Sequence, residues 1–144
     1  MLFPSREWCE AAAAAMVRDP EVIAAIADFG PVVAGVVIEG PGADFCVLAR
    51  VEPGRPVNLS YPEDEDELEA LEPDYIGWVS FSLCKELLEK THAGERPDPL
   101  RAILERKVRL QGDLERLVKH AGRHQGAGLT ALRGVPTEFA QEAF

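Results

Sequence analysis

The stretch RKVRLQGDLERLVKHAGRHQ, from Arg106 to Gln125, changes its periodicity in the middle. From Lys107 to Gln111 apolar and polar residues alternate, which predicts a strand with one buried side. After Gly112, the carboxylate of Asp113 can cap a helix whose apolar residues recur at helical spacing. The stretch therefore predicts a strand that a glycine turn joins to an amphipathic helix.

A strand that enters a helix through a glycine can hold a phosphate on its backbone N–H groups. Here Asp113 places a carboxylate where that anion would bind, so the turn indicates a self-capped helix instead. Basic side chains around the turn are the better candidates for contact with the charge of a ligand, although a solvated basic surface is the commoner outcome. These candidates are Arg106, Lys107, Arg109 and Lys119.

The chain has 144 residues, a length typical of one domain, and we expect residues 1–144 to form a single unit. Its net charge of −10 argues against binding to nucleic acid or to an anionic membrane, since both need Lys and Arg. The longest apolar runs, such as Val32 to Ile38, are far too short to span a bilayer, so no stable membrane insertion is expected.

Charge is distributed unevenly along the chain. Residues Glu63 to Asp74 carry eight acids and no base, whereas Arg101 to Arg123 carry seven bases against three acids. The three cysteines are widely spaced and form no C-x-x-C pair, so neither a disulfide framework nor a zinc site is indicated. These features predict a protein of the reducing cytoplasm.

The first half of the chain predicts two helices followed by strands. Ser5 is a helix cap, and Asp19 followed by Pro20 is a second helix start. Runs of β-branched residues then predict strands at 32–39, at 43–51, in a shorter segment ending at Tyr61, and at 75–80. The acidic segment 63–74 between the last two strands is expected to be a solvated connection or a short helix.

The second half predicts three helices and the strand of the opening stretch. The helices cover residues 81–90, a short segment that begins after Asp98, and the segment after Asp113. Inward-facing side chains of the last two are expected to be Leu100, Ile103, Leu104, Leu114, Leu117, Val118 and Ala121. This order of elements predicts an α+β domain whose mostly antiparallel sheet is covered on one face by helices.

Two short patterns could carry chemistry. Ser82 and Lys85 match the S-x-x-K pattern of acyl-transfer enzymes, but the partner motifs of those enzymes are missing. His120 and His124 lie one helical turn apart, a spacing that can bind a metal, but no neighbouring residue supplies a third ligand. We therefore expect no catalytic residue, no metal site and no cofactor.

Three segments of the second half resemble the lipid-binding domain of the sterol-carrier-protein-type-2 family. They are PDYIGWVSFSLCKELLEK at 73–90, PDPLRAILERKVRLQGDLERLVKHA at 97–121, and VPTEF at 135–139. The resemblance implies a five-stranded sheet with helices on one face and an apolar tunnel for a fatty acid, a fatty acyl-CoA or a sterol-like molecule. It also implies a carrier that is not an enzyme.

On this resemblance, the apolar side chains of the second half would line the tunnel, and the basic residues named above would meet the head group. The expected lining residues are Ile76, Trp78, Phe81, Leu87, Leu100, Ile103, Leu104, Leu110, Leu114, Leu117, Val118 and Leu132. The chain ends in Gln141 to Phe144, without the peroxisomal tripeptide of eukaryotic relatives, which favours a prokaryotic protein. The alternative hypothesis is an accessory module, with a homodimer as one form, that supports a partner enzyme.

Overall fold

A five-stranded sheet forms the centre of the structure, a computed structural model that describes residues 1–40, 42–96, 98–124 and 126–139. The order of its strands is β4-β3-β2-β5-β6. Within this sheet β2 and β5 pair in parallel, and the other neighbouring strands are antiparallel. The strands are β2 (Val32–Glu39), β3 (Phe45–Val51), β4 (Asn58–Ser60), β5 (Tyr75–Ser80) and β6 (Arg109–Gln111). The predicted mostly antiparallel sheet is therefore confirmed.

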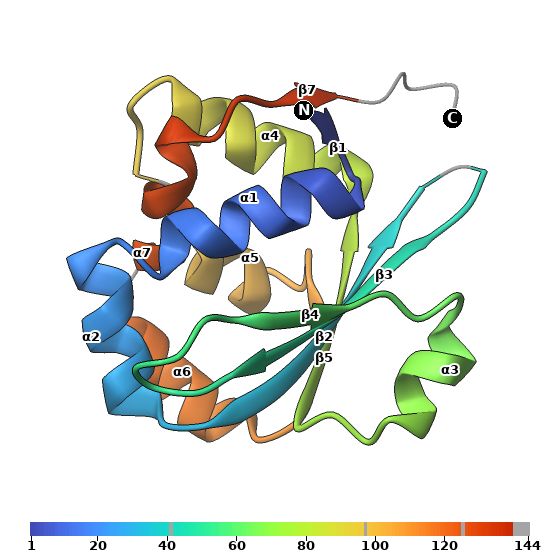
Figure 1. Ribbon diagram of the computed structural model, residues 1–144, viewed down its shortest axis with the longest axis horizontal. Helices are drawn as coiled ribbons and strands as arrows, with labels where there is room; N and C mark the ends of the chain where they lie inside the picture. The colour runs from blue at the N-terminus through green and yellow to red at the C-terminus, as the bar shows by residue number, and fades with distance from the viewer. Residues whose placement is uncertain (41, 97, 125, 140–144) are drawn as a thin grey trace.

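Helices cover one face of this sheet, as Figure 1 shows for α1, α4 and α5. Side-chain oxygens cap several of them as the sequence predicts, with Ser5 accepting from the Trp8 backbone N–H and Asp19 from that of Glu21. The helices other than α3 are α1 (Arg6–Met16), α2 (Pro20–Phe29), α4 (Phe81–His92), α5 (Pro99–Leu104), α6 (Leu114–Arg123), α7 (Ala127–Thr130) and the 3-10 turn η1 (Ala131–Gly134).

Helix α3 (Glu65–Ala70) lies on the opposite face of the sheet (Figure 1). Asp66, Glu67 and Glu69 are exposed, whereas Leu68 is fully buried against the sheet. Glu65 is half-buried and accepts from the Trp78 indole N–H at 3.0 Å. A Cβ atom built on Gly35 of β2 would lie 2.7 Å from Leu68 Cδ1, so the glycine makes the room that this leucine occupies. The acidic segment is therefore a short helix that Leu68 and the Trp78–Glu65 hydrogen bond hold to the sheet.

Two very short strands join the ends of the described chain. β1 (Leu2–Phe3) pairs in parallel with β7 (Glu138–Phe139), an arrangement that the sequence did not predict. The pairing buries Phe3, which is 2% exposed. Residues 141–144, whose sequence lacks the peroxisomal tripeptide, lie outside the described part of the chain.

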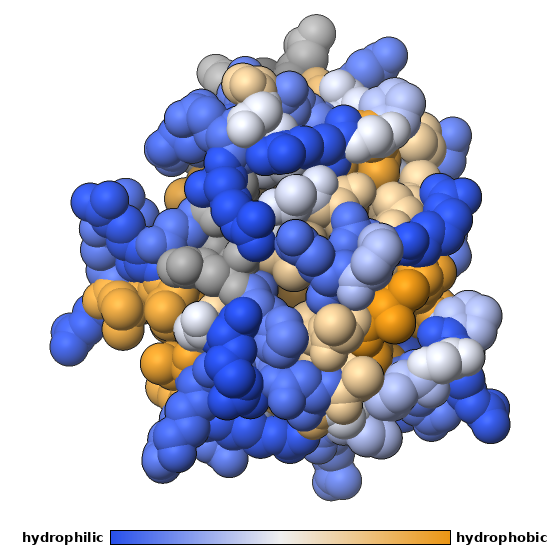
Figure 2. Space-filling model, turned by 90° about the vertical axis from the view of Figure 1, so that its left-hand side faces the viewer, coloured by the Kyte–Doolittle hydropathy of each residue, from blue (hydrophilic) through white to orange (hydrophobic). Residues whose placement is uncertain are grey.

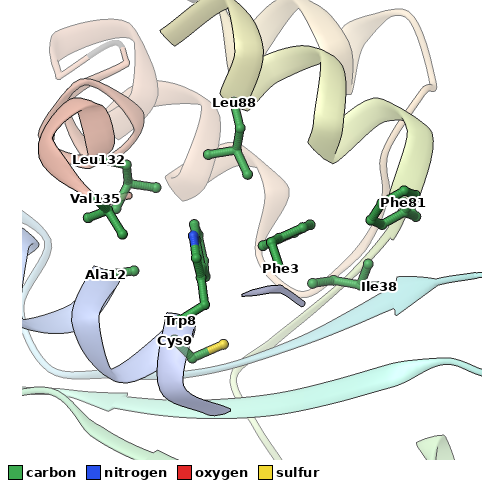
Figure 3. Packing of buried hydrophobic residues seen from close by; sticks show 9 residues of the cluster. All are labelled: Phe3, Trp8, Cys9, Ala12, Ile38, Phe81, Leu88, Leu132 and Val135. Atoms are coloured by element: carbon green, nitrogen blue, oxygen red, sulfur yellow. The ribbon is translucent and has the colours of Figure 1, made fainter. Parts of the chain in front are cut away.

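The main hydrophobic core lies between the sheet, α1, α4 and the segment that follows α7 (Figure 3). Aromatic rings form the centre of this core. The Phe3 ring packs edge to face with Trp8, with centroids 4.7 Å apart, and stacks with the Phe81 ring, whose centroid lies 6.1 Å from that of Phe3. The Trp8 indole N–H donates to Thr137 Oγ1 at 2.9 Å, which ties α1 to the C-terminal segment. The side chains of this core are therefore shielded from solvent.

The turn between β6 and α6 contains the glycine of the opening stretch. Gly112 has φ +135°, a backbone conformation that favours glycine. A Cβ atom at this position would lie 2.5 Å from Tyr75 Cδ1, and the Tyr75 hydroxyl donates to the Asp113 carbonyl at 3.0 Å. Asp113 in turn accepts from the Arg116 backbone N–H at 3.1 Å. The turn is therefore a packed joint with a self-capped helix.

The helices of the described residues are short or polar by the standards of a bilayer span. None of them combines the length and the apolar character that crossing a membrane requires.

Candidate functional site

Six of the predicted lining residues share one property, which is that each is half-buried. They belong to α4, α5, β6 and α6, and they are Leu87, Leu100, Ile103, Leu110, Leu117 and Val118. Helix α5 contacts α6, and β6 leads directly into α6. We call this set the half-buried apolar set. Its members retain solvent contact in a protein whose aromatic core is closed.

Helix α6 has a polar outer side and no fully buried residue. Side chains at its edge hold it to α2. The Arg116 guanidinium lies over the Phe29 ring, 4.2 Å from its centroid, and also donates to the Phe29 carbonyl. His120 Nε2 lies 2.7 Å from the Ala25 carbonyl oxygen. The helix therefore relies on polar contacts rather than on deep burial of its apolar side.

A cleft of about 350 Å³ lies between α4 and α5 and is close to the lower limit for small-molecule sites. Its apolar lining is Leu83, Leu87 and Ala102. Its charged lining is balanced, with four acids and four bases: Glu86, Glu95, Asp98, Glu105, Lys90, Arg96, Arg101 and Lys107. Leu83 was not among the predicted lining residues, although it lies one helical turn before Leu87 and the spacing could have indicated it.

Six other predicted lining residues lie elsewhere. Phe81 and Leu132 are 4% and 3% exposed and belong to the closed aromatic core (Figure 3). Ile76 and Trp78 point to the opposite face of the sheet, where they pack with Leu68 of α3. The prediction that they line one tunnel with the apolar side chains of α4, α5 and α6 is wrong. The alternation of side chains along a strand defines two sides without saying which helices cover each.

Leu104 and Leu114 complete the predicted set. They are 67% and 44% exposed, so the expectation that they face inward is wrong. Each lies at an end of a short helix, where helical spacing defines a face poorly.

The four predicted head-group residues are also dispersed. Only Lys107 lines the cleft, and its Nζ lies 3.2 Å from Glu105 Oε2. The Arg109 guanidinium lies over the Trp78 ring at 4.6 Å, on the α3 side of the sheet. Lys119 pairs with Glu115 on the outer side of α6, and Arg106 is exposed at the turn after α5.

Nucleophilic cysteine chemistry is unsupported in the described residues. Burial is the main cause that raises the pKa of the Cys9 thiol to about 11 and that of Cys84 to about 12, and it also raises the pKa of Cys46. All three thiols are therefore protonated near neutral pH, whereas the thiolate is the reactive form. Cys84 lies on α4 beside the aromatic core, where it acts as an apolar side chain.

The side of the molecule formed by α2 and α6 is mainly hydrophilic (Figure 2). Figure 2 shows that apolar groups on this side form separate patches between hydrophilic side chains. A surface of this kind is typical of a protein whose apolar contacts are mostly internal.

Comparisons with solved structures identify the fold. The chain superimposes on a conserved hypothetical protein from Thermus thermophilus, described as possibly a sterol carrier protein, with a TM-score of 0.72 and 13% identity over 96% of this chain and 92% of the other. A crystal structure of sterol carrier protein 2 superimposes with a TM-score of 0.71 and 14% identity, over 92% of this chain and 98% of the other. The apo form of sterol carrier protein 2 from Yarrowia lipolytica superimposes with a TM-score of 0.50 and 9% identity, over 85% of this chain and 88% of the other. No protein-family model and no curated protein matches the sequence.

Proposed function

The chain has the fold of sterol carrier protein 2, and from this premise we propose that it binds and carries a fatty-acyl ligand without catalysing a reaction. The acyl chain lies along the half-buried apolar set, between α4, α5, β6 and α6. The observation that carries this proposal is that these six apolar side chains are neither buried nor fully exposed. The elements that carry them are linked, since α4 and α5 line one cleft, α5 contacts α6, and β6 leads into α6. An acyl chain supplies the burial that the protein alone leaves incomplete.

The energetics of such binding need no reactive group. Each methylene moved from water to an apolar site contributes roughly 0.8 kcal/mol. A sixteen-carbon chain therefore gains on the order of 12 kcal/mol before the costs of association and ordering, which remove a large part of it. A micromolar dissociation constant, about −8 kcal/mol, is within reach.

The α4–α5 cleft is the proposed position of the head group. Lys107 and Arg101 line it and can donate to a carboxylate, while Glu86 and Asp98 keep the lining close to neutral. This balance favours a head group with a single negative charge over the several charges of a coenzyme A ester. We therefore rank free fatty acids before acyl-CoA esters and sterol-like molecules.

The proposal predicts that gently purified protein retains lipid. Native mass spectrometry should show an adduct of fatty-acid mass, and solvent extraction followed by mass analysis should identify it. The same protein, once delipidated, should take up a fluorescent fatty acid in a saturable manner. A clean apo mass together with absent uptake would overturn the proposal, and a doubled mass in the same experiment would favour the dimerising accessory module instead.

A further inference from the structure

Two histidines and one aspartate meet where α6 packs against α2. Asp28 lies in the last turn of α2, and His120 and His124 lie at the end of α6. One ligand atom from each residue can be chosen so that all three lie within 4.8 Å of one another. Asp28 supplies the third ligand that the sequence around the two histidines lacks.

Local contacts hold these side chains in position. His124 Nε2 lies 3.0 Å from Asp28 Oδ2, and its side chain is 22% exposed. His120 packs edge to face on the Phe29 ring at 4.9 Å, and its Nε2 lies 2.7 Å from the Ala25 carbonyl oxygen. Both imidazoles are therefore directed toward α2, with a carboxylate and a backbone carbonyl beside them.

We propose that Asp28, His120 and His124 form a binding site for a divalent transition metal ion of the Zn²⁺ class. Two imidazoles and one carboxylate form the three-residue ligand set found in open zinc sites, in which water takes the fourth position. Imidazole selects this class of ion over Mg²⁺ and Ca²⁺, which prefer oxygen ligands. Zinc–ligand distances of about 2.0–2.2 Å require the three groups to close slightly around the ion, which side-chain rotation allows.

Arg123 is the group that competes with the ion. Its Nε and Nη2 atoms donate to Asp28 Oδ2 at 3.0 and 2.8 Å. The Arg123 side chain is 58% exposed, and exposed ion pairs of this kind are weak. Both hydrogen bonds use one carboxylate oxygen, and the long side chain can turn into solvent. Arg123 therefore lowers the affinity of the site without blocking it.

The site joins α2 to a helix that has no fully buried residue. A bound ion would replace exchangeable polar contacts by coordination bonds at the C-terminal end of α6. Leu117 and Val118 of the half-buried apolar set lie on the same helix. The metal site is a separate property from lipid binding, and it would fix the position of this helix.

Isothermal titration of the full chain with Zn²⁺, after removal of any histidine tag, tests the site. We expect one ion per chain, with affinity at least tenfold weaker in His120→Ala, His124→Ala and Asp28→Asn. His92→Ala is the matched control, because His92 is exposed at the end of α4, and it should bind as the parent does. Arg123→Gln should bind more tightly than the parent, since the competing cation is removed. Circular dichroism establishes that each variant is folded.

Two further measurements make the result decisive. Substitution by Co²⁺ should give the visible absorption of a low-coordinate nitrogen and oxygen site, without the intense thiolate charge-transfer band that cysteine ligands would produce. Hydrogen exchange of the α6 amides should slow on addition of Zn²⁺. Absent binding, or binding that survives the three substitutions, would overturn the proposal and leave the cluster as an ion-pair network only.

Discussion

Replacement of Phe81 by alanine is expected to lower the free energy of unfolding by about 3–5 kcal/mol. Phe81 is 4% exposed, and its ring packs against those of Phe3 and Phe139, with centroids 6.1 and 6.3 Å away. Truncation removes its transfer free energy and leaves a cavity that neighbouring rings cannot fill. Urea denaturation followed by circular dichroism measures the loss, which would be a large share of the roughly 5–15 kcal/mol typical of a domain.

Ile23→Ala is the control for this substitution. Ile23 is 50% exposed on α2, so its truncation should change stability by no more than about 0.5 kcal/mol. A loss below about 1 kcal/mol in Phe81→Ala would mean that the aromatic cluster is not the closed core described above. The milder variant Phe81→Leu should keep fatty-acid uptake, because this residue supports the fold rather than the proposed ligand.

Ile103→Asp should weaken fatty-acid binding at least about tenfold, because it places a charge where the acyl chain is proposed to lie. Ile103 is half-buried on α5, the short helix that contacts α6. Displacement of a fluorescent fatty acid measures the change. Leu117→Asp, on the facing helix α6, should have an effect of the same direction.

Leu104→Asp provides a matched control on the same helix. Leu104 is adjacent in sequence to Ile103 but 67% exposed, so the same chemical change should leave binding unaltered. Urea denaturation establishes that both variants are folded. Equal losses of affinity in the two variants, or no loss in either, would contradict the proposed position of the acyl chain.

Local signals in the sequence are sufficient for most of the secondary structure. Asp19 with Pro20 predicts the start of α2, and alternation or β-branched runs predict the strands. The prediction of a self-capped helix start at Gly112 is confirmed, since Asp113 accepts from the Arg116 N–H. These features depend on residues that are close in the chain, and for that reason one sequence reveals them.

Contacts between distant residues are not predictable in the same way. The β1–β7 pairing joins the two ends of the described chain, and Leu68 anchors an otherwise acidic segment. The prediction that Trp78 lines the tunnel is wrong, because the alternation of side chains along a strand does not say which helix covers which face of the sheet. Asp28 and His124 are 96 positions apart in the sequence, so the sequence around the two histidines does not reveal the third residue of the proposed metal site.

The dependence of affinity on acyl-chain length tests the central claim most directly. If the half-buried apolar set binds the acyl chain, the affinity for saturated fatty acids should rise steadily from eight to about sixteen carbons. Displacement titrations, with every fatty acid below its micelle concentration, measure this affinity. Burial of one methylene at roughly 0.8 kcal/mol corresponds to about a threefold to fourfold gain per carbon, ending where the chain outgrows the site. Affinity that stays constant across the series would contradict the account, because burial of the acyl chain would then contribute nothing to the free energy of binding.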